Sequence, residues 1–131
     1  MRSLPRLLLA APLLLVVGCT SGVKKSFTTV EIEPDSKGVQ RVEINMHSYY
    51  FEPSRVVVHA GHPVELVLKN RAKLVPHNVT FVDSSFAKSE GAWLGTGHLN
   101  FTPQRPGEYE FYCHVDAHAK KGMTGVLVVV P

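Results

Sequence analysis

The stretch FYCHVDAHAKKGM, residues 111–123, contains a cysteine, two histidines and a methionine close to the C-terminal end of the chain. Thiolate, imidazole and thioether groups are soft or borderline metal ligands. Cys113, His118 and Met123 follow one another with four residues between each pair, and His77 lies well upstream at the head of another predicted strand. Two strand ends and one loop could therefore bring four ligands to a single metal ion.

The types of these ligands favour copper over other metals. A thiolate and two imidazoles in a trigonal arrangement, with a long axial thioether, are typical of mononuclear blue copper sites. Structural zinc sites usually take sulfur from CxxC pairs, which this chain lacks. Calcium and magnesium prefer oxygen ligands, and iron–sulfur clusters need more cysteines than the two present. The alternative for Cys113 alone is a buried free cysteine. We predict one type 1 copper ion.

The elements that must position these ligands are short strands. Alternating or β-branched runs recur along the chain, with Pro and Gly between them, which predicts an antiparallel β-sandwich of about seven strands. Residues 84–93 are expected to form a helical turn or an irregular excursion, with Phe86 and Trp93 packed. The predicted strands lie within residues 39–47, 55–70, 77–83, 98–102, 107–113 and 125–130.

The N-terminus has the layout of an export signal. Arg2 and Arg6 precede an apolar run that is too short for a comfortable membrane span. The sequence VVGC, ending at Cys19, resembles the bacterial lipobox, in which the cysteine is acylated and becomes the first mature residue. We therefore predict a lipoprotein signal peptide over 1–18, a lipidated tether over 19–38 and a folded domain over 39–131.

Acylation of Cys19 would leave Cys113 with no partner for a disulfide within the chain. Such a thiol in an exported protein needs burial or metal ligation for protection. The predicted location is the bacterial cell envelope, with the protein lipid-anchored on its periplasmic or extracellular face. The chain of 131 residues fits one domain, and a net charge of +3 is far from that of a nucleic-acid binder, so no nucleic-acid partner is expected.

Four stretches resemble the plastocyanin-like cupredoxins, and the resemblance covers most of residues 39–131. It is carried by YYFEPSRVVVHAGHPVELVLKN, VPHNVTF, FTPQRPGEYEFYC and HAKKGMTGVLVVV. The C-x4-H-x4-M spacing is more similar to auracyanin or rusticyanin than to plastocyanin. This resemblance implies a Greek-key β-sandwich of seven to eight strands, the cupredoxin fold.

The same resemblance implies roles for individual residues. His77, Cys113 and His118 would be the strong copper ligands and Met123 the weak axial ligand. Asn78 would hydrogen-bond across to the backbone of the ligand loop and support it independently of the metal. The implied protein is a monomer that exchanges electrons with redox proteins docked near His118.

The ligand loop departs from the family pattern in two places. His114 stands directly after the cysteine, and on strand alternation its side chain should point to the opposite face, away from the metal. VDAH, residues 115–118, stands where VPGH is common, so a side-chain cap from Asp116 is expected to hold the turn. Solvent exposure without a function is expected for His114 and for His47, His59, His62 and His98.

The pattern leaves two functions open. The first is a membrane-tethered electron carrier that cycles between Cu(II) and Cu(I). The second is an envelope copper-binding protein for copper delivery or buffering, which the seven histidines favour and the tight ligand loop disfavours. Copper oxidases and nitrite reductases need a further histidine-rich site, and no hydrolase motif is present, so we predict that the chain is not an enzyme.

Overall fold

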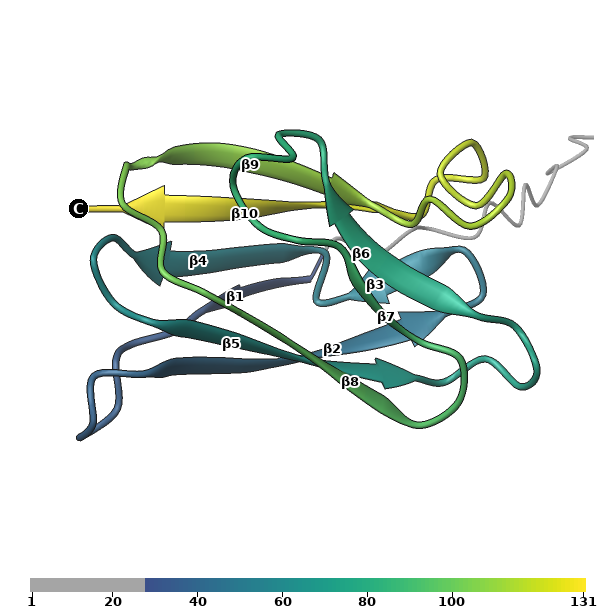
Figure 1. Cartoon of the computed structure of the whole chain (residues 1–131), viewed down its shortest axis with the longest axis horizontal. Helices are drawn as coiled ribbons and strands as arrows, with labels where there is room; N and C mark the ends of the chain where they lie inside the picture. Colours follow the sequence, from purple (N-terminus) through teal and green to yellow (C-terminus); the bar gives the residue numbers. More distant parts are fainter. Residues whose placement is uncertain (1–27) are drawn as a thin grey trace, which may run out of the picture.

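A computed structural model describes residues 28–131 as a β-sandwich (Figure 1). The all-β prediction is confirmed, since this part of the chain contains no helix. Three strands of only three residues, too short to give a periodic signal in the sequence, raise the number above the predicted seven to eight. The strands are β1 (Thr29–Glu31), β2 (Gln40–His47), β3 (Tyr50–Glu52), β4 (Arg55–His59), β5 (Val64–Asn70), β6 (His77–Phe81), β7 (Glu90–Ala92), β8 (Thr96–Phe101), β9 (Gly107–Tyr112) and β10 (Thr124–Val130).

The strands form two sheets with mixed pairing. One sheet has the order β1-β4-β10-β9-β6-β7 and the other β3-β2-β5-β8. Most pairs are antiparallel, as predicted, but β1–β4, β4–β10 and β2–β5 are parallel. Figure 1 shows the loop between β9 and β10 at one end of the sandwich and the C-terminus at the other. The candidate ligands therefore gather at one end of the molecule.

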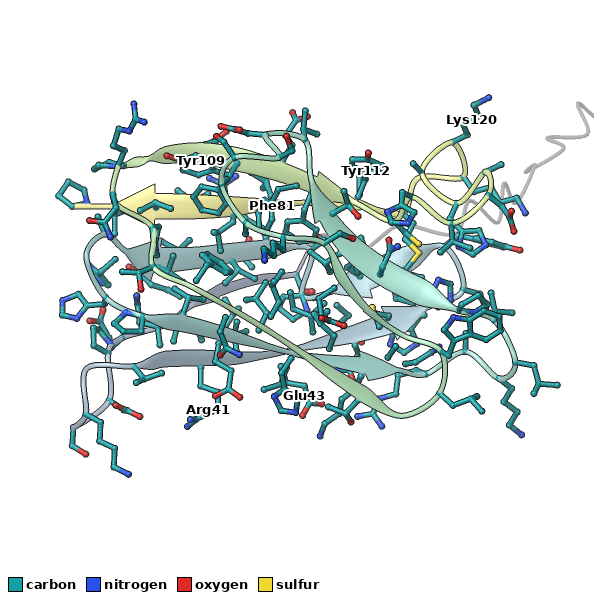
Figure 2. The ribbon with its side chains drawn as sticks, viewed as in Figure 1. Arg41, Glu43, Phe81, Tyr109, Tyr112 and Lys120 are labelled. Carbon is teal, nitrogen blue, oxygen red and sulfur yellow. The ribbon has the colours of Figure 1, made fainter. Side chains whose placement is uncertain are left out.

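The core lies between the two sheets and follows the alternation of the strands. In β2, Val42, Ile44 and Met46 are buried while Arg41 and Glu43 are exposed. Figure 2 shows Arg41 and Glu43 pointing away from the sandwich. The centre of the core is aromatic: the Phe111 ring meets the rings of Phe51 and Phe81 edge-on, at centroid distances of 5.2 and 5.7 Å. Such edge-to-face pairs add to the stabilisation from burial.

The folded domain begins before the boundary predicted at residue 39. Residues 29–31, placed in the tether by the sequence analysis, form β1 along the edge of β4. Val30 and Ile32 pack against the core, which explains why this segment joins the sheet. The following turn is closed by Asp35, whose side chain accepts hydrogen bonds from the backbone N–H groups of Lys37 and Val39. Turn-forming residues in this segment therefore mark a connection within the domain.

The segment predicted as irregular is partly a strand. Residues 82–89 form no regular element, and β7 follows them and pairs with β6. Phe86 packs as predicted, stacking on Tyr109 at 3.9 Å between ring centroids. The packing predicted for Trp93 is wrong, because 78% of its surface is exposed.

Within residues 28–131, no helix is long and apolar enough to cross a membrane. The predicted signal peptide and the predicted acylation site, Cys19, lie outside the described residues.

Gln40 is a buried polar residue at the end of the sandwich away from the candidate ligands. Its side chain takes the place of a neighbouring strand as the hydrogen-bond partner of the His59 backbone. Its side chain accepts a hydrogen bond from the N–H of His59 at 2.6 Å and donates one to the carbonyl oxygen of the same residue at 3.0 Å. Gln40→Leu should therefore leave two backbone groups unsatisfied and lower the free energy of unfolding by about 3 kcal/mol. Urea denaturation measures this, and Gln104→Leu, at an exposed position, should change it little. Equal effects of the two substitutions would contradict the assigned role.

Candidate metal centre

Three predicted ligands converge at the end of the sandwich that carries the β9–β10 loop. His77 begins β6, Cys113 directly follows β9, and His118 lies within the loop. Their side-chain ligand atoms lie within 4.8 Å of one another, and all three residues are buried. None of the other histidines of residues 28–131 joins this group. The ligand loop, Cys113–Met123, therefore meets the start of β6 as the sequence predicted.

The distances between these atoms match those expected for ligands that share one ion. The Sγ of Cys113 lies 3.5 Å from the Nδ1 of His118 and 3.9 Å from the Nδ1 of His77. A first-row metal with ordinary metal–sulfur and metal–nitrogen bonds would separate its sulfur and nitrogen ligands by about 3.6–3.8 Å. The residues present therefore fit a mononuclear soft-metal site.

The environment keeps His77 in the form that binds metal. Burial of the imidazole lowers the pKa of His77 to about 4, with smaller contributions from repulsion by His118 and His47. Its Nε2 is buried and has no hydrogen-bond partner among the described residues. A neutral imidazole with Nδ1 directed at the thiol can offer that nitrogen to a metal without first losing a proton.

The lowered pKa predicts how the stability of the copper-free protein depends on pH. Unfolded His77 takes up a proton near pH 6.5, whereas folded His77 takes it up near pH 4. Between these values the unfolded state binds more protons, so the free energy of unfolding should fall as the pH falls, by up to about 3 kcal/mol. Denaturant unfolding at several pH values measures this. His77→Leu should flatten the slope in that window, and an unchanged slope would contradict the assignment.

Met123 lies at the closing end of the ligand loop. Its side chain is completely buried, and its backbone ties the loop together. The N–H of Cys113 donates to the carbonyl of Met123 at 3.1 Å, and the N–H of Met123 donates to the carbonyl of His118 at 3.0 Å. The three candidate ligands of the loop are thus linked by backbone hydrogen bonds, which support their positions independently of any ion.

Asn78 makes the hydrogen bond that the sequence analysis predicted. Its Oδ1 accepts the backbone N–H of His114 at 2.9 Å and so joins β6 to the ligand loop. The His114 side chain is exposed, yet it has contacts that were not predicted: its Nδ1 lies 2.7 Å from the hydroxyl of Thr80, and the amide nitrogen of Asn78 lies within 3.1 Å of both ring nitrogens. His114 therefore lies outside the ligand group but helps to hold the loop against β6.

A glycine in β7 allows close packing beside the first ligand. A Cβ added at Gly91 would lie 2.7 Å from the backbone oxygen of His77 and 2.8 Å from the Cβ of Asn78. Only a residue without a side chain permits this approach of β7 to β6. Gly91 thus helps to hold both His77 and Asn78 in place.

The turn in VDAH is held differently from the prediction. Its closing hydrogen bond runs from the N–H of His118 to the carbonyl of Val115 at 3.1 Å, and the predicted side-chain cap from Asp116 is not found within residues 28–131. Asp116 instead adopts a φ of 43°. Asp enters this left-handed region more readily than most residues, whereas proline is held near −65°. Proline at position 116 could not adopt this positive φ, so the turn in VDAH must differ in backbone conformation from a turn in VPGH.

Asp116→Pro should disrupt the ligand loop, because proline cannot adopt the positive φ of this turn. We expect the stability to fall by more than about 1 kcal/mol and the spectrum of bound copper to change or disappear. Thermal unfolding and visible absorption measure the two effects. Asp116→Gly keeps the required conformation and should preserve both properties. If Asp116→Pro preserved them as well, the assigned turn would be wrong.

The structure also shows a residue near the site that the sequence analysis missed. Tyr49, in the turn between β2 and β3, meets the ring of His118 edge-on at 5.1 Å between centroids. His118 is only 5% exposed. No spacing signal could identify Tyr49, since the contact joins distant segments from the two sheets.

Comparisons with known proteins agree with this fold. The family described as cupredoxin-like domain matches residues 10–129. The fold is similar to auracyanin from Roseiflexus castenholzii in its dithionite-reduced form, with a TM-score of 0.62, 21% identity and coverage of 70% of this chain and 97% of that one. Auracyanin A from Chloroflexus aurantiacus, a blue copper protein, gives 0.61 at 24% identity, covering 71% of this chain and 100% of that one.

A third similar structure comes from a different kind of protein. The metal-binding domain of the Cu(I)-exporting P-type ATPase CopA from Streptococcus pneumoniae D39 gives a TM-score of 0.64 at 22% identity, and the match covers 80% of this chain and 98% of that one. At these identities the structural likenesses show the fold, while the family match spans most of the chain. The chain belongs to the cupredoxin-like family, and its His77, Cys113, His118 and Met123 have the arrangement typical of a type 1 copper site.

Proposed function

We propose that this protein is a mononuclear blue copper protein that carries single electrons at the bacterial cell envelope. The observation that carries the proposal is the closed site: His77, Cys113 and Met123 are at most 1% exposed and His118 is 5% exposed. Bound copper would supply a one-electron couple. The protein would hold the two imidazoles and the sulfur ligands nearly unchanged in both oxidation states, because the surrounding strands and loop bonds restrict their movement.

The copper-loaded protein itself tests this function. We expect intense visible absorption, an EPR signal of blue copper and a reversible one-electron couple. A colourless protein with an exchangeable copper ion and no reversible couple would contradict the proposal. The same measurements would then support the second candidate, copper delivery or buffering. That candidate is favoured by the likeness to the metal-binding domain of a Cu(I)-exporting ATPase and disfavoured by the burial of the ligands.

We propose that redox proteins dock at the end of the sandwich that carries the ligand loop. His118 offers little surface there, but the neighbouring loops expose Leu74, Trp93 and Leu94. Trp93 borders a surface depression that His114 of the ligand loop also lines. Lys120 projects from the outer side of the loop (Figure 2). Electron transfer needs close approach to the copper, and this end provides it.

Attachment to the membrane through Cys19 is part of the proposal. The VVGC sequence supports export, acylation and location at the envelope surface, and the domain would act there as a monomer without enzymatic activity. Growth of an expressing bacterium with a labelled fatty acid tests this. The full chain should carry the label and sediment with membranes, whereas Cys19→Ser should do neither. Label retained by the Cys19→Ser variant would contradict acylation at this residue.

A further inference from the structure

Tyr49 has an unusual backbone conformation for an aromatic residue. It lies in the tight turn after His47 and before Tyr50, and its φ is 71°. Left-handed φ values favour glycine and are uncommon for bulky side chains. Glycine would adopt this φ with less steric strain than tyrosine. The presence of a tyrosine therefore suggests that its ring has a role outside the turn.

The ring of Tyr49 contacts two residues of the ligand loop. It meets the His118 ring edge-on, with an interplanar angle of 69°. The Nζ of Lys121 lies over the Tyr49 ring, 4.0 Å from its centroid, within the range of a cation–π interaction. Tyr49 comes from the four-stranded sheet, whereas the loop joins two strands of the six-stranded sheet. The contact thus closes the sandwich across the two sheets beside the candidate metal centre.

We propose that Tyr49, held by Lys121, is a cap that separates His118 and the Cys113 thiol from solvent. Two observations agree with this role: the Tyr49 ring contacts the His118 ring, and His118 is only 5% exposed. The inference rests on the proposed function in one respect: a site closed in this way retains its metal and so suits an electron carrier better than a copper donor. The contacts of the cap themselves do not depend on that function.

The cap depends on the ring of Tyr49 and its position. No hydrogen bond of the Tyr49 hydroxyl to residues 28–131 is found, so phenylalanine should preserve the cover over His118. Glycine would remove the cover while remaining compatible with the positive φ, so the turn should still form. Lys121→Gln removes the cation that holds the ring and should weaken the cover only in part.

The test uses the full copper-free chain with Cys19→Ser, so that Cys113 is its single thiol. Reaction of that thiol with a small aromatic disulfide measures access to the site, since exposure controls thiol reactivity. Tyr49→Gly should react faster by about tenfold or more, Tyr49→Phe at the original rate and Lys121→Gln at an intermediate rate. Thermal unfolding of each variant shows whether it is folded.

The copper-loaded proteins give a second measurement. Transfer of Cu(I) to a chelator should be faster for Tyr49→Gly and unchanged for Tyr49→Phe. The cap is overturned if folded Tyr49→Gly shows the original thiol reactivity, or if Tyr49→Phe reacts as fast as Tyr49→Gly. Absence of a blue copper spectrum in the unsubstituted protein would instead overturn the proposed function, and the copper-free reaction would still decide whether the cap exists.

Discussion

Cys113→Ser should abolish the intense visible absorption of the copper-loaded protein. The reason is that the thiolate defines a blue copper site, and a serine hydroxyl is a poor, harder ligand that stays protonated at neutral pH. Cys113 is completely buried, and its sulfur lies 3.9 Å from the Nδ1 of His77 and 3.5 Å from the Nδ1 of His118. It is the single cysteine of residues 28–131, so no other thiol in this part of the chain can replace it. The affinity for copper should fall by more than the ~10–100-fold cost of losing an outer hydrogen bond around a metal ligand. Absorption and EPR titrations with copper measure both changes.

The second cysteine provides a matched control. Cys19→Ser makes the same chemical change in the predicted acylation segment and should leave the colour, the EPR signal and the copper affinity unchanged. Colour retained by Cys113→Ser together with a reversible couple would contradict the ligand assignment. Loss of folding would not explain the predicted result, because serine is nearly isosteric with cysteine, and unfolding of the copper-free variants checks this directly.

The sequence was sufficient to predict that His77, Cys113 and His118 come together, because their positions follow from local rules. Alternation along residues 107–113 places Cys113 on the buried face with Phe111, and the head of an upstream strand, residues 77–81, supplies His77. The even spacing within the ligand loop then brings in His118 and Met123. The all-β fold follows from the same alternation, because each run is too short for a helix and is bounded by turn residues.

Features that depend on contacts between distant segments could not be predicted in this way. The parallel pairing of β2 with β5, and of β4 with β1 and β10, is a property of the chain path through space. β1 has only three residues, so its alternation carries too little information to distinguish it from a tether. In the sequence, nothing distinguishes Tyr49 from an ordinary turn residue. Only the structure shows that its ring contacts the ring of His118. The sequence also gives no sign that His118 is covered.

Gly125→Ala should destabilise the fold more than any surface change, although it adds a single methyl group. A Cβ at this position would lie 2.3 Å from the Cζ of Phe111 and 2.7 Å from the backbone oxygen of Ser54. Real atoms do not approach this closely, and the buried ring has little room to move because it packs against other core rings. We expect a loss of about 3 kcal/mol, at the upper end of the cost of overpacking a core. Denaturant unfolding of the copper-free protein measures it.

Gly125→Ala should also alter the metal centre. A change in the spectrum of bound copper would distinguish this effect from a loss of stability alone. Gly125 pairs with Phe111 across β9 and β10, and each lies two residues from an end of the ligand loop, at Met123 and Cys113. A shift of either strand would change the separation of these two ligands. Phe111→Leu in the Gly125→Ala background removes the ring atoms of the closest clash and should recover part of the spectrum. The clash of the added Cβ with the backbone oxygen of Ser54 would remain, so the recovery should be incomplete. If Gly125→Ala left stability and colour unchanged, the close packing beneath the ligand loop would be wrong.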